Sequence, residues 1–328
     1  MNNWKDIVNC IKCFDDIVIL THTNMDGDAM GSASALCHGL RKLGKKCVIL
    51  LEDKVPGYLN FMHIADEKKD NTPVFVDSMP YTPRLAIAVD CGDKSRIENR
   101  LSVFDSAEKK ICIDHHIQMD CFADYSVVDP DLAATGILVY ELLKELGVQI
   151  DTHMAEDIYV AIASDTGRFK YSNTTAYVHQ VIAELYSYGI DHVKLCNAVF
   201  DTFPVSQIKA EGIATDKMEV FADGKAVISS ITMDEIAAVG ASYDQVNTCI
   251  DRIRLVEGTE IAVFLKEKEK NVFRVSFRAK TYADVNRLAV AVGGGGHIKA
   301  SGATLKMPLN EAIELLKNET VKELDRFK

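Results

Sequence analysis

Short apolar runs alternate with longer stretches of helical spacing in the first half of the chain. The runs are rich in Val and Ile and are bounded by Asp, Gly, Thr and Pro, which is typical of buried parallel strands. We predict four such strands: Ile17–Leu20, Cys47–Leu51, Leu85–Val89 and Lys110–Ile113. We predict four helices in the same half: Ala29–Leu43, Thr135–Leu146, Met154–Ser164 and Thr175–Tyr188. This alternation indicates an α/β fold, a doubly wound and mostly parallel sheet with helices on both faces.

The last third of the chain has a different pattern. We predict four strands there: Ala226–Ile231, Glu260–Leu265, Asn271–Phe277 and Ala303–Met307. We predict three helices: Gln245–Val256, Asp284–Val292 and Asn310–Leu324. These elements favour a smaller mixed α/β domain at residues 215–328, joined to a first domain at residues 1–190 by a partly helical connector at residues 191–214. We expect the active-site cleft to lie between the two domains.

Composition narrows the class of protein. The 328 residues are 48% hydrophobic and 26% charged, which is ordinary for a soluble globular protein. No apolar run approaches the roughly 18–20 residues that span a bilayer, and the N-terminus does not resemble a signal peptide. The nine cysteines are scattered, many of them in apolar runs. We therefore expect reduced thiols and a cytoplasmic protein that does not bind membranes.

Charge is distributed unevenly. Residues 213–328 carry 17 basic and 17 acidic side chains, so the net charge of −11 lies entirely in residues 1–212. Bound divalent cations would relieve part of that repulsion. An acidic surface argues against tight binding of long duplex nucleic acid. It still permits a short phosphorylated ligand in a local cationic pocket.

Histidine and aspartate residues gather where the predicted strands and helices end. In chain order these residues are His22, Asp26, Asp28, Asp90, Asp114, His115, His116 and Asp165. Ligands of an open α/β sheet bind beyond the carboxyl ends of its strands, so these side chains are expected to converge. Two divalent metals about 3.5–4 Å apart need a bridging carboxylate, hard oxygen ligands and some imidazole. Asp90 is well placed to bridge.

Each of these motifs alone has an ordinary structural explanation. Asp26-Gly27-Asp28 alone is usually a turn, two adjacent histidines are often polar surface, and Asp90 is a plausible helix N-cap. Jointly this explanation fails, because four independent loops would each have to end a buried strand or helix with a metal-ligand type. The sequence therefore predicts a site for two divalent metals.

The four motifs together resemble those of the DHH phosphoesterase superfamily, which includes RecJ-type exonucleases, family II pyrophosphatases, exopolyphosphatases and small-nucleotide phosphodiesterases. The resemblance implies two manganese ions bridged by Asp90, although the same ligand types also suit Mg²⁺ or Co²⁺. The implied ligand sets are His22, Asp26 and Asp90 for one ion, and Asp28, Asp90, His115 and Asp165 for the other. It further implies that His116 faces the substrate phosphate, to stabilise charge or aid proton transfer, and that Asp114 orients a histidine. The implied catalytic residues are thus Asp90, Asp114 and His116.

A glycine-rich segment, Gly293–Ala303, is the second strong signal. Consecutive glycines let backbone N–H groups approach an anion closely, and His297, Lys299 and Ser301 add donors. Four glycines also occur in flexible hairpins and linkers, but here a predicted helix precedes them and a predicted strand follows. The segment resembles the Gly-Gly-Gly-His-x-x-Ala-Ser-Gly signature of the DHH-associated C-terminal domain, which binds substrate.

The resemblance also implies the residues that would grip a substrate phosphate. They are Arg278, Gly294, Gly295, Gly296, His297, Ser301 and Gly302. An arginine can bind phosphate through two parallel hydrogen bonds, which suits Arg278 in its predicted strand. Arg168, beside Asp165, is a further candidate, and a surface salt bridge explains it equally well.

These expectations combine into a metal-dependent hydrolase of phosphoric esters. The two-domain layout looks most like the group of bifunctional oligoribonucleases and pAp phosphatases, called nanoRNases. We expect a manganese-dependent phosphodiesterase and phosphatase that converts short oligoribonucleotides such as pApA, and pAp, to mononucleotides. The alternative is a soluble phosphodiesterase for cyclic di-AMP or pApA. An inorganic pyrophosphatase, an exopolyphosphatase, a zinc amidohydrolase and an inactive nucleotide sensor fit less well. The oligomeric state is not set by the sequence, and a homodimer stays open.

Overall fold

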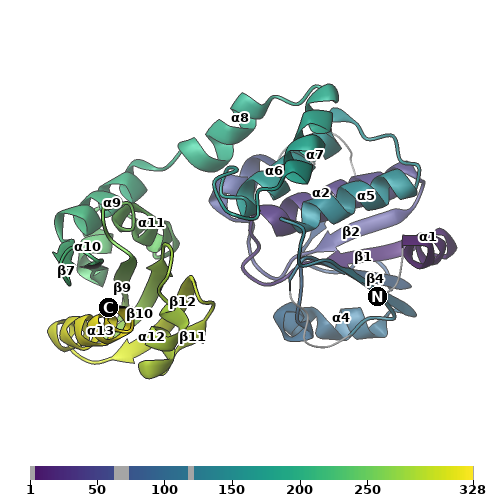
Figure 1. The fold of residues 1–328 in the computed structure, drawn as a ribbon. Coiled ribbons are helices and arrows are strands. Elements are labelled where there is room, and N and C mark those ends of the chain that lie inside the picture. Colours follow the sequence, from purple (N-terminus) through teal and green to yellow (C-terminus); the bar gives the residue numbers. More distant parts are fainter. Residues whose placement is uncertain (1–3, 63–73, 117–121, 328) are drawn as a thin grey trace. The chain divides into compact units, whose positions relative to one another are not determined.

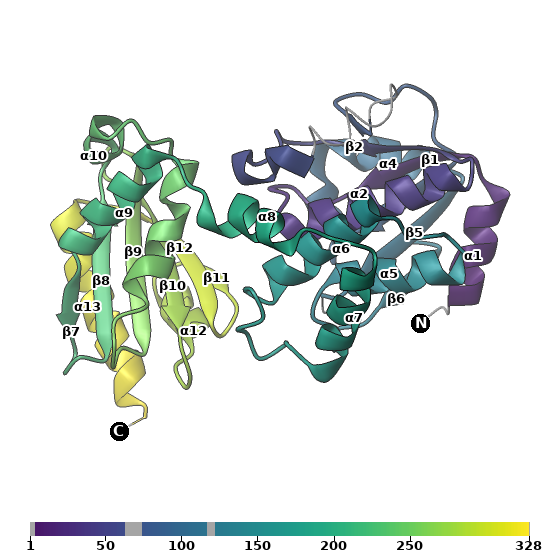
Figure 2. The same cartoon turned by 90° about the horizontal axis from the view of Figure 1, so that it is seen from above.

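The computed structural model describes residues 4–62, 74–116 and 122–327, which pack as two compact units, Met1–Thr202 and Phe203–Lys328 (Figures 1 and 2). Near the boundary, α8 (His192–Cys196) and a π-helical turn at Asn197–Asp201 belong to the first unit, and α9 (Val205–Asp216) belongs to the second. The segment expected to connect the domains is therefore largely helical.

The first unit is built on a six-stranded parallel sheet. Its strands are β1 (Asp16–Leu20), β2 (Lys46–Leu50), β3 (Phe75–Val76), β4 (Leu85–Val89), β5 (Lys109–Asp114) and β6 (Tyr125–Val128). They follow the order β3-β2-β1-β4-β5-β6, and each neighbouring pair is parallel. The four predicted strands are present, and the short β3 and β6 were missed. The strand order reverses between β1 and β4, which is where an open α/β sheet forms its ligand-binding crevice.

Helices cover both faces of this sheet (Figure 1). They are α1 (Trp4–Cys13), α2 (Gly27–Lys42), α4 (Leu101–Ser106), α5 (Thr135–Glu145), α6 (Thr152–Asp165) and α7 (Ala176–Ser187), with 3₁₀ turns at Gly57–Leu59 and Lys94–Arg100. Because strand side chains alternate between faces, Ile17 and Ile19 pack with the cluster formed by α1, α2, α5 and α6. Val18 and Leu20 pack on the other face with Phe104 of α4. The doubly wound fold predicted from the sequence is confirmed.

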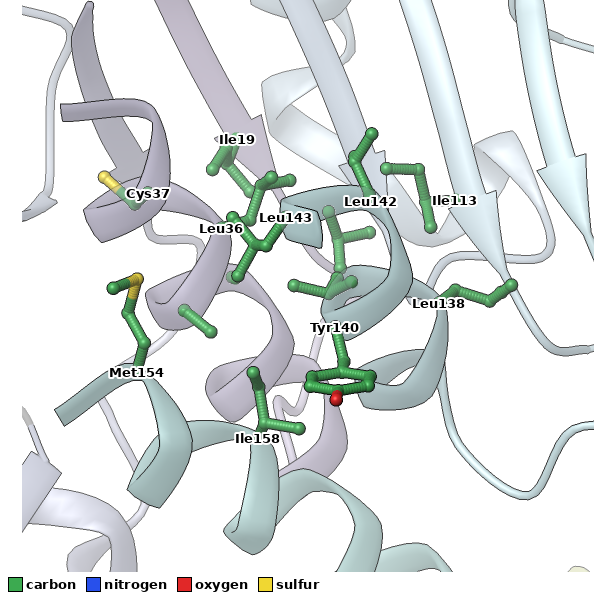
Figure 3. Close-up of a cluster of buried hydrophobic side chains, with 14 of the residues drawn as sticks. Ile19, Leu36, Cys37, Ile113, Leu138, Tyr140, Leu142, Leu143, Met154 and Ile158 are labelled. Carbon is green, nitrogen blue, oxygen red and sulfur yellow. The ribbon is translucent and has the colours of Figure 1, made fainter. Parts of the chain in front are cut away.

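The larger core lies between the sheet and the layer of α2, α5 and α6 (Figure 3). Leu36 of α2, Leu142 of α5 and Ile158 of α6 turn their side chains into it, and all three are fully buried. Helices α2 and α6 approach closely at Gly31, where a Cβ atom would lie 2.3 Å from the backbone oxygen of Asp157. This approach fixes how the two helices pack.

Replacing Gly31 with alanine is expected to lower the free energy of unfolding of the first unit by about 2–3 kcal/mol, because a backbone atom cannot move aside as a side chain can. Urea denaturation followed by circular dichroism measures the change. Gly57→Ala is the matched control, since a Cβ there meets no described atom within 4 Å. Equal stability of both variants would show that the helix pair adjusts freely at this contact.

The second unit is a mixed sheet with helices on both faces. Its strands are β7 (Glu219–Phe221), β8 (Ala226–Ile231), β9 (Ile261–Glu269), β10 (Val272–Ala279), β11 (Gly295–Gly296) and β12 (Ala300–Lys306), in the order β11-β12-β10-β9-β8-β7. Only the β8–β9 pair among these is parallel. Its helices are α9, α10 (Met233–Ala238), α11 (Cys249–Ile253), α12 (Val285–Ala291) and α13 (Leu309–Asp325).

Strand residues of the second unit alternate between two cores. Ile261 and Val263 of β9 pack with the cluster on the α12 and α13 side, whereas Ala262 and Phe264 pack with α9 and α11. The mixed α/β architecture was predicted, but one element differs. The continuous helix expected over Gln245–Val256 is a 3₁₀ turn at Asp244–Thr248 followed by the short α11. Among the residues that the structure describes, no helix is both long and apolar enough to cross a bilayer.

Candidate metal centre

The motifs at the ends of β1, β4 and β5 meet at the carboxyl edge of the first sheet. These strands are neighbours, and they are followed directly by the segments that carry His22, Asp90 and His115. The Nε2 atom of His22 lies 3.4 Å from Oδ2 of Asp90, and Nε2 of His115 lies 3.7 Å from Oδ1 of the same carboxylate. Asp90 therefore stands between the two histidines.

Three groups of donor atoms overlap here, each with its atoms within 4.8 Å of one another. They are His22, Asp26 and Asp90; Asp28, His115 and Asp165; and Asp90, His115 and His116. The first group is the ligand set that the motif resemblance implied for one ion. The second group contains the set implied for the other ion, except for Asp90. The shortest contact joins Nε2 of His115 to Oδ2 of Asp165, at 3.1 Å. The arrangement can hold metal ions.

The start of α2 supplies two further carboxylates. Asp26 is the N-cap of α2, and its Oδ1 accepts hydrogen bonds from the backbone N–H groups of Asp28 and Ala29. Asp28 is fully buried, and its two oxygens accept from the backbone N–H groups of Thr135 and Gly136 at 2.7 and 2.9 Å. Those groups open α5, so the positive end of that helix stabilises the buried carboxylate.

Thr135 is a positioning residue that sequence reasoning missed. Its hydroxyl donates to Oδ1 of Asp90 at 2.9 Å, while its backbone N–H donates to Asp28. One residue thereby holds two carboxylates from different elements. The only signal in the sequence was its position at the predicted start of a helix, where threonine is common for other reasons.

Backbone carbonyls set the orientation of the two histidines. The Nδ1 atom of His22 lies 2.7 Å from the carbonyl of Thr23, and Nδ1 of His115 lies 3.2 Å from that of Leu132. A carbonyl accepts only from a protonated Nδ1, so in each neutral ring Nε2 is the atom with a free lone pair. Both Nε2 atoms face the carboxylates.

The backbone of Asp90 has an unusual conformation, with φ at +56°. A non-glycine residue in this left-handed region costs roughly 1–3 kcal/mol and persists where surrounding structure fixes it. The backbone N–H of Asp90 still donates to the carbonyl of Ile113 in β5. In this conformation its carboxylate lies within 3.7 Å of the Nε2 atoms of both histidines.

Charge is concentrated strongly at this site. Burial raises the pKa of Asp28 well above its ordinary value, and the charges of Asp90 and Asp165 raise it further. Burial disfavours the charged form of His22, but hydrogen bonds to Asp26 and Asp90 outweigh it and raise its pKa to about 10. The nearby carboxylates of Asp165 and Asp90 raise the pKa of His115 to about 9 against the effect of burial. Without cations, protons on Asp28 and on the two imidazoles would offset part of this negative charge.

One buried atom indicates how well a cation would fit. Nε2 of His115 is buried and forms no hydrogen bond of acceptable geometry with any described residue, despite its contact with Asp165. A buried polar atom without a partner is costly, and a metal ion would satisfy it. Carboxylate oxygens with imidazole nitrogen also form the donor set that Mn²⁺ accepts. The residues therefore fit a divalent cation.

Asp114 and His116 form a pair at the edge of the centre. Nδ1 of His116 lies 2.8 Å from Oδ1 of Asp114, which is fully buried at the end of β5. The hydrogen bond to Asp114 raises the pKa of His116, whose side chain is 39% exposed. Gly92 permits this packing, since a Cβ there would lie 3.0 Å from Cβ of His116. The pair presents a partly exposed imidazole whose orientation is set by a buried carboxylate.

The Asp114→Asn variant is expected to lower kcat by about 10- to 100-fold, because the imidazole loses its orienting carboxylate. If protonated His116 is needed, activity falls as pH rises through its pKa. Loss of the carboxylate lowers that pKa, so the alkaline limb of the pH–rate profile should move to lower pH. A reduced rate with an unmoved profile would assign Asp114 a purely structural role.

The glycine-rich segment of the second unit is a hairpin of β11 and β12. His297 and Ala300 exchange backbone hydrogen bonds across its turn, and the His297 side chain is exposed. Glycine is needed at Gly294, where a Cβ would lie 2.1 Å from the backbone oxygen of Gly302, and at Gly296, whose φ is +146°. The candidate histidine is thus held on an ordered, tightly packed turn.

The other candidates of this unit lie beside the hairpin. Arg278 is the second-last residue of β10 and pairs in register with Ala300, and one of its guanidinium N–H groups donates to the carbonyl of Phe277. The Ser301 hydroxyl is buried and donates to the carbonyl of Val285. Gly295 is exposed beside Gly302 of β12.

Arg168 follows α6 in the first unit. Its guanidinium donates to Oδ1 of Asp201 at 2.8 Å and lies over the ring of Phe200. The side chain is 41% exposed, and its backbone φ is +60°. The surface salt bridge that the sequence left open is therefore present, and it occupies part of the guanidinium.

Comparison with known proteins identifies the two units as domains of known families. Residues 16–162 match the DHH family, N-terminal domain, and residues 223–324 match the DHHA1 domain. The chain is 33% identical over 311 residues to the bifunctional oligoribonuclease and PAP phosphatase NrnA of Thermus thermophilus, and the match covers 94% of this chain and 90% of that protein.

Solved structures share the fold. An exopolyphosphatase-related protein from Bacteroides fragilis superposes with a TM-score of 0.89 at 24% identity, over 97% of this chain and 95% of that one. RecJ of Thermus thermophilus, solved in complex with Mn²⁺, has a TM-score of 0.55 at 12% identity, over 99% of this chain and 55% of that one.

The fold, the donor groups at the strand ends and the relative together define a hydrolase that acts on phosphoric esters. The chain belongs to the DHH family and carries a DHHA1 domain in its second unit. The family resemblance seen in the sequence motifs is confirmed.

Proposed function

We propose that the protein is a manganese-dependent phosphodiesterase and phosphatase that hydrolyses short oligoribonucleotides such as pApA, and pAp, to mononucleotides. The observation that carries this proposal is the position of Asp90, whose carboxylate lies 3.4 Å from Nε2 of His22 and 3.7 Å from Nε2 of His115. The activity for which the Thermus thermophilus relative is named supports the choice of substrates. The acidic first unit suits short ligands better than long duplexes.

In this proposal the ligands are His22, Asp26 and Asp90 on one side and Asp28, Asp90, His115 and Asp165 on the other. A bound metal pair supplies Lewis-acid chemistry, which activates water and neutralises phosphoryl charge. His116, oriented by Asp114, which also raises its pKa, would donate a hydrogen bond to the substrate phosphate or a proton to the leaving oxygen.

The hairpin of the second unit recognises a further phosphate of the substrate. His297 contributes its exposed imidazole, and Arg278 contributes the guanidinium donors that its contact with Phe277 leaves available. The backbone at Gly295 and Gly296 can approach an anion because no Cβ atom blocks the way, whereas the N–H group of Gly294 already donates to the carbonyl of Ala289. Ser301 and Gly302 shape the turn, and Arg168 is a weaker candidate because Asp201 engages it.

Chromatographic product analysis tests the proposal. The metal-free protein would be loaded with Mn²⁺ or Mg²⁺ and incubated in parallel with pApA, pAp, cyclic di-AMP and pyrophosphate. Conversion of pApA and pAp to AMP, fastest with Mn²⁺ and with cyclic di-AMP intact, is the expected result. Faster cleavage of cyclic di-AMP would replace the proposal with second-messenger turnover, and release of phosphate from pyrophosphate alone would make the protein a pyrophosphatase.

The His297→Ala variant is expected to raise KM for pApA and pAp by about 10-fold or more, the magnitude of one hydrogen bond to a charged group. Hydrolysis of bis-p-nitrophenyl phosphate should change little, because that ester lacks a terminal phosphate. Ile298→Ala, which removes an exposed apolar side chain from the same turn, is the control. An equal loss on all three substrates would place His297 in the chemical step.

A further inference from the structure

A second cluster of metal-donor side chains lies within the first unit, at the contact between α2 and α6. It consists of His38 on α2 and of His153 and Asp157 on α6, with donor atoms within 4.8 Å of one another. His153 and Asp157 are four residues apart, so they share one face of their helix. This cluster uses none of the residues of the candidate metal centre.

The spacing of the donor atoms is close to that of a tetrahedral metal site. Zinc holds imidazole nitrogen and carboxylate oxygen at about 2.0–2.1 Å, which places neighbouring ligand atoms about 3.3 Å apart. The Nε2 atoms of His38 and His153 lie 3.2 Å apart, and Nε2 of His153 lies 3.9 Å from Oδ2 of Asp157. Only a small side-chain movement would bring all three donors onto one ion.

The surroundings of the cluster favour a cation. The side chains of Asp157 and His153 are only 3% and 14% exposed, so the carboxylate has lost most of its hydration. Ser34, one turn before His38 on α2, donates its hydroxyl to Oδ2 of Asp157 at 2.7 Å. A hydrogen-bonded carboxylate of this kind is held in a fixed orientation, as metal ligands usually are.

A cavity gives access to the cluster. It has a volume of about 90 Å³ and is lined by His153 and Asp157 together with Glu156 and Lys194, among others. This space is large enough for water, which can complete the coordination of an ion held by three protein ligands.

We propose that His38, His153 and Asp157 form a separate binding site for a single divalent transition metal, with Zn²⁺ as the best fit to two imidazoles and one carboxylate. The helices run antiparallel, since Gly27 faces Ser164 while His38 faces His153. The site therefore lies about 15 Å along α2 from Asp28. An ion there would hold α2 and α6 together at the ends of the helix pair that lie away from Asp28 and Asp165.

Metal counting on the full chain tests this site. Wild-type protein and the His38→Gln and His153→Gln variants would be stripped, equilibrated with Zn²⁺, passed through gel filtration and assayed by elemental analysis. Wild type should retain one more zinc per chain than either variant, and both variants should lose the same single equivalent. His192→Gln, a histidine on α8 outside the cluster, should retain the wild-type count.

A second measurement uses wild-type protein, in case a variant folds poorly. With the catalytic centre saturated with Mg²⁺, added Zn²⁺ should shift the ring-nitrogen NMR signals of His38 and His153 and raise the melting temperature. Equal zinc counts in wild type and both folded variants, or ring-nitrogen signals that Zn²⁺ leaves unmoved, would overturn the proposal. The contact between the two histidines would then be a hydrogen bond that holds no metal.

Discussion

Replacing Asp90 with alanine will lower kcat for pApA by at least about 10³-fold, because the loss removes the carboxylate that lies between Nε2 of His22 and Nε2 of His115, where it would bridge two ions. That factor corresponds to about 4 kcal/mol of transition-state stabilisation, the scale expected for metal-assisted charge neutralisation. The variant should also bind fewer than two Mn²⁺ ions per chain. Steady-state kinetics and metal titration on the same preparation measure both effects.

Asp93→Ala is the control for this experiment. Asp93 lies three residues further along the same loop, where its carboxylate accepts from the backbone N–H of Ser95 at the start of a 3₁₀ turn. Its loss costs about 1 kcal/mol of stability and leaves turnover intact. An Asp90→Ala variant that kept near-native activity with manganese would refute the dinuclear arrangement itself.

The affinity for Mn²⁺ should rise steeply with pH, by about 10- to 100-fold per pH unit between pH 6.5 and 8.5. Neighbouring carboxylates raise the pKa of His22 to about 10 and of His115 to about 9, so both rings are protonated at neutral pH in the metal-free protein. A metal ion can bind each Nε2 atom only after its proton leaves. Binding therefore releases one to two protons, and a higher pH favours it.

Calorimetric titration in buffers of different ionisation enthalpy counts the released protons directly. His22→Gln removes one of the two titrating rings, so it should reduce the number of released protons by about one. Proton release from His115 should remain. An affinity that stayed flat across this pH range, with no proton release, would show that neither imidazole is a ligand.

Much of the site was predictable because its signals are local. Each ligand-bearing segment directly follows an apolar strand or ends a helix, as with His22 after β1 and Asp90 after β4. In a parallel sheet those ends must lie along one edge, so periodicity alone brings distant residues together. The strands β1, β2, β4 and β5 were predictable because each contains a strong apolar run in the local sequence.

The parts that were missed depend on contacts between distant segments. Thr135 touches Asp28 and Asp90 only after α5 has docked, and no local pattern marks that role. The pairing of His38 with His153 spans 115 residues. The two-residue β3 is defined by its neighbour β2 and carries too little pattern of its own. The 3₁₀ turn at Asp244–Thr248 fell largely within a predicted α-helix, because the spacing of apolar residues does not distinguish the two kinds of helix over a single turn.

The order in which the ligands occur along the chain has a consequence for synthesis. The candidate metal donors of the centre run from His22 to Asp165 along the chain. About half of the polypeptide must therefore be synthesised before the last of them is present. A nascent or truncated chain ending before α6 has the strands but an incomplete centre. Such a fragment would lack Asp165, so it could not assemble the full set of donor atoms.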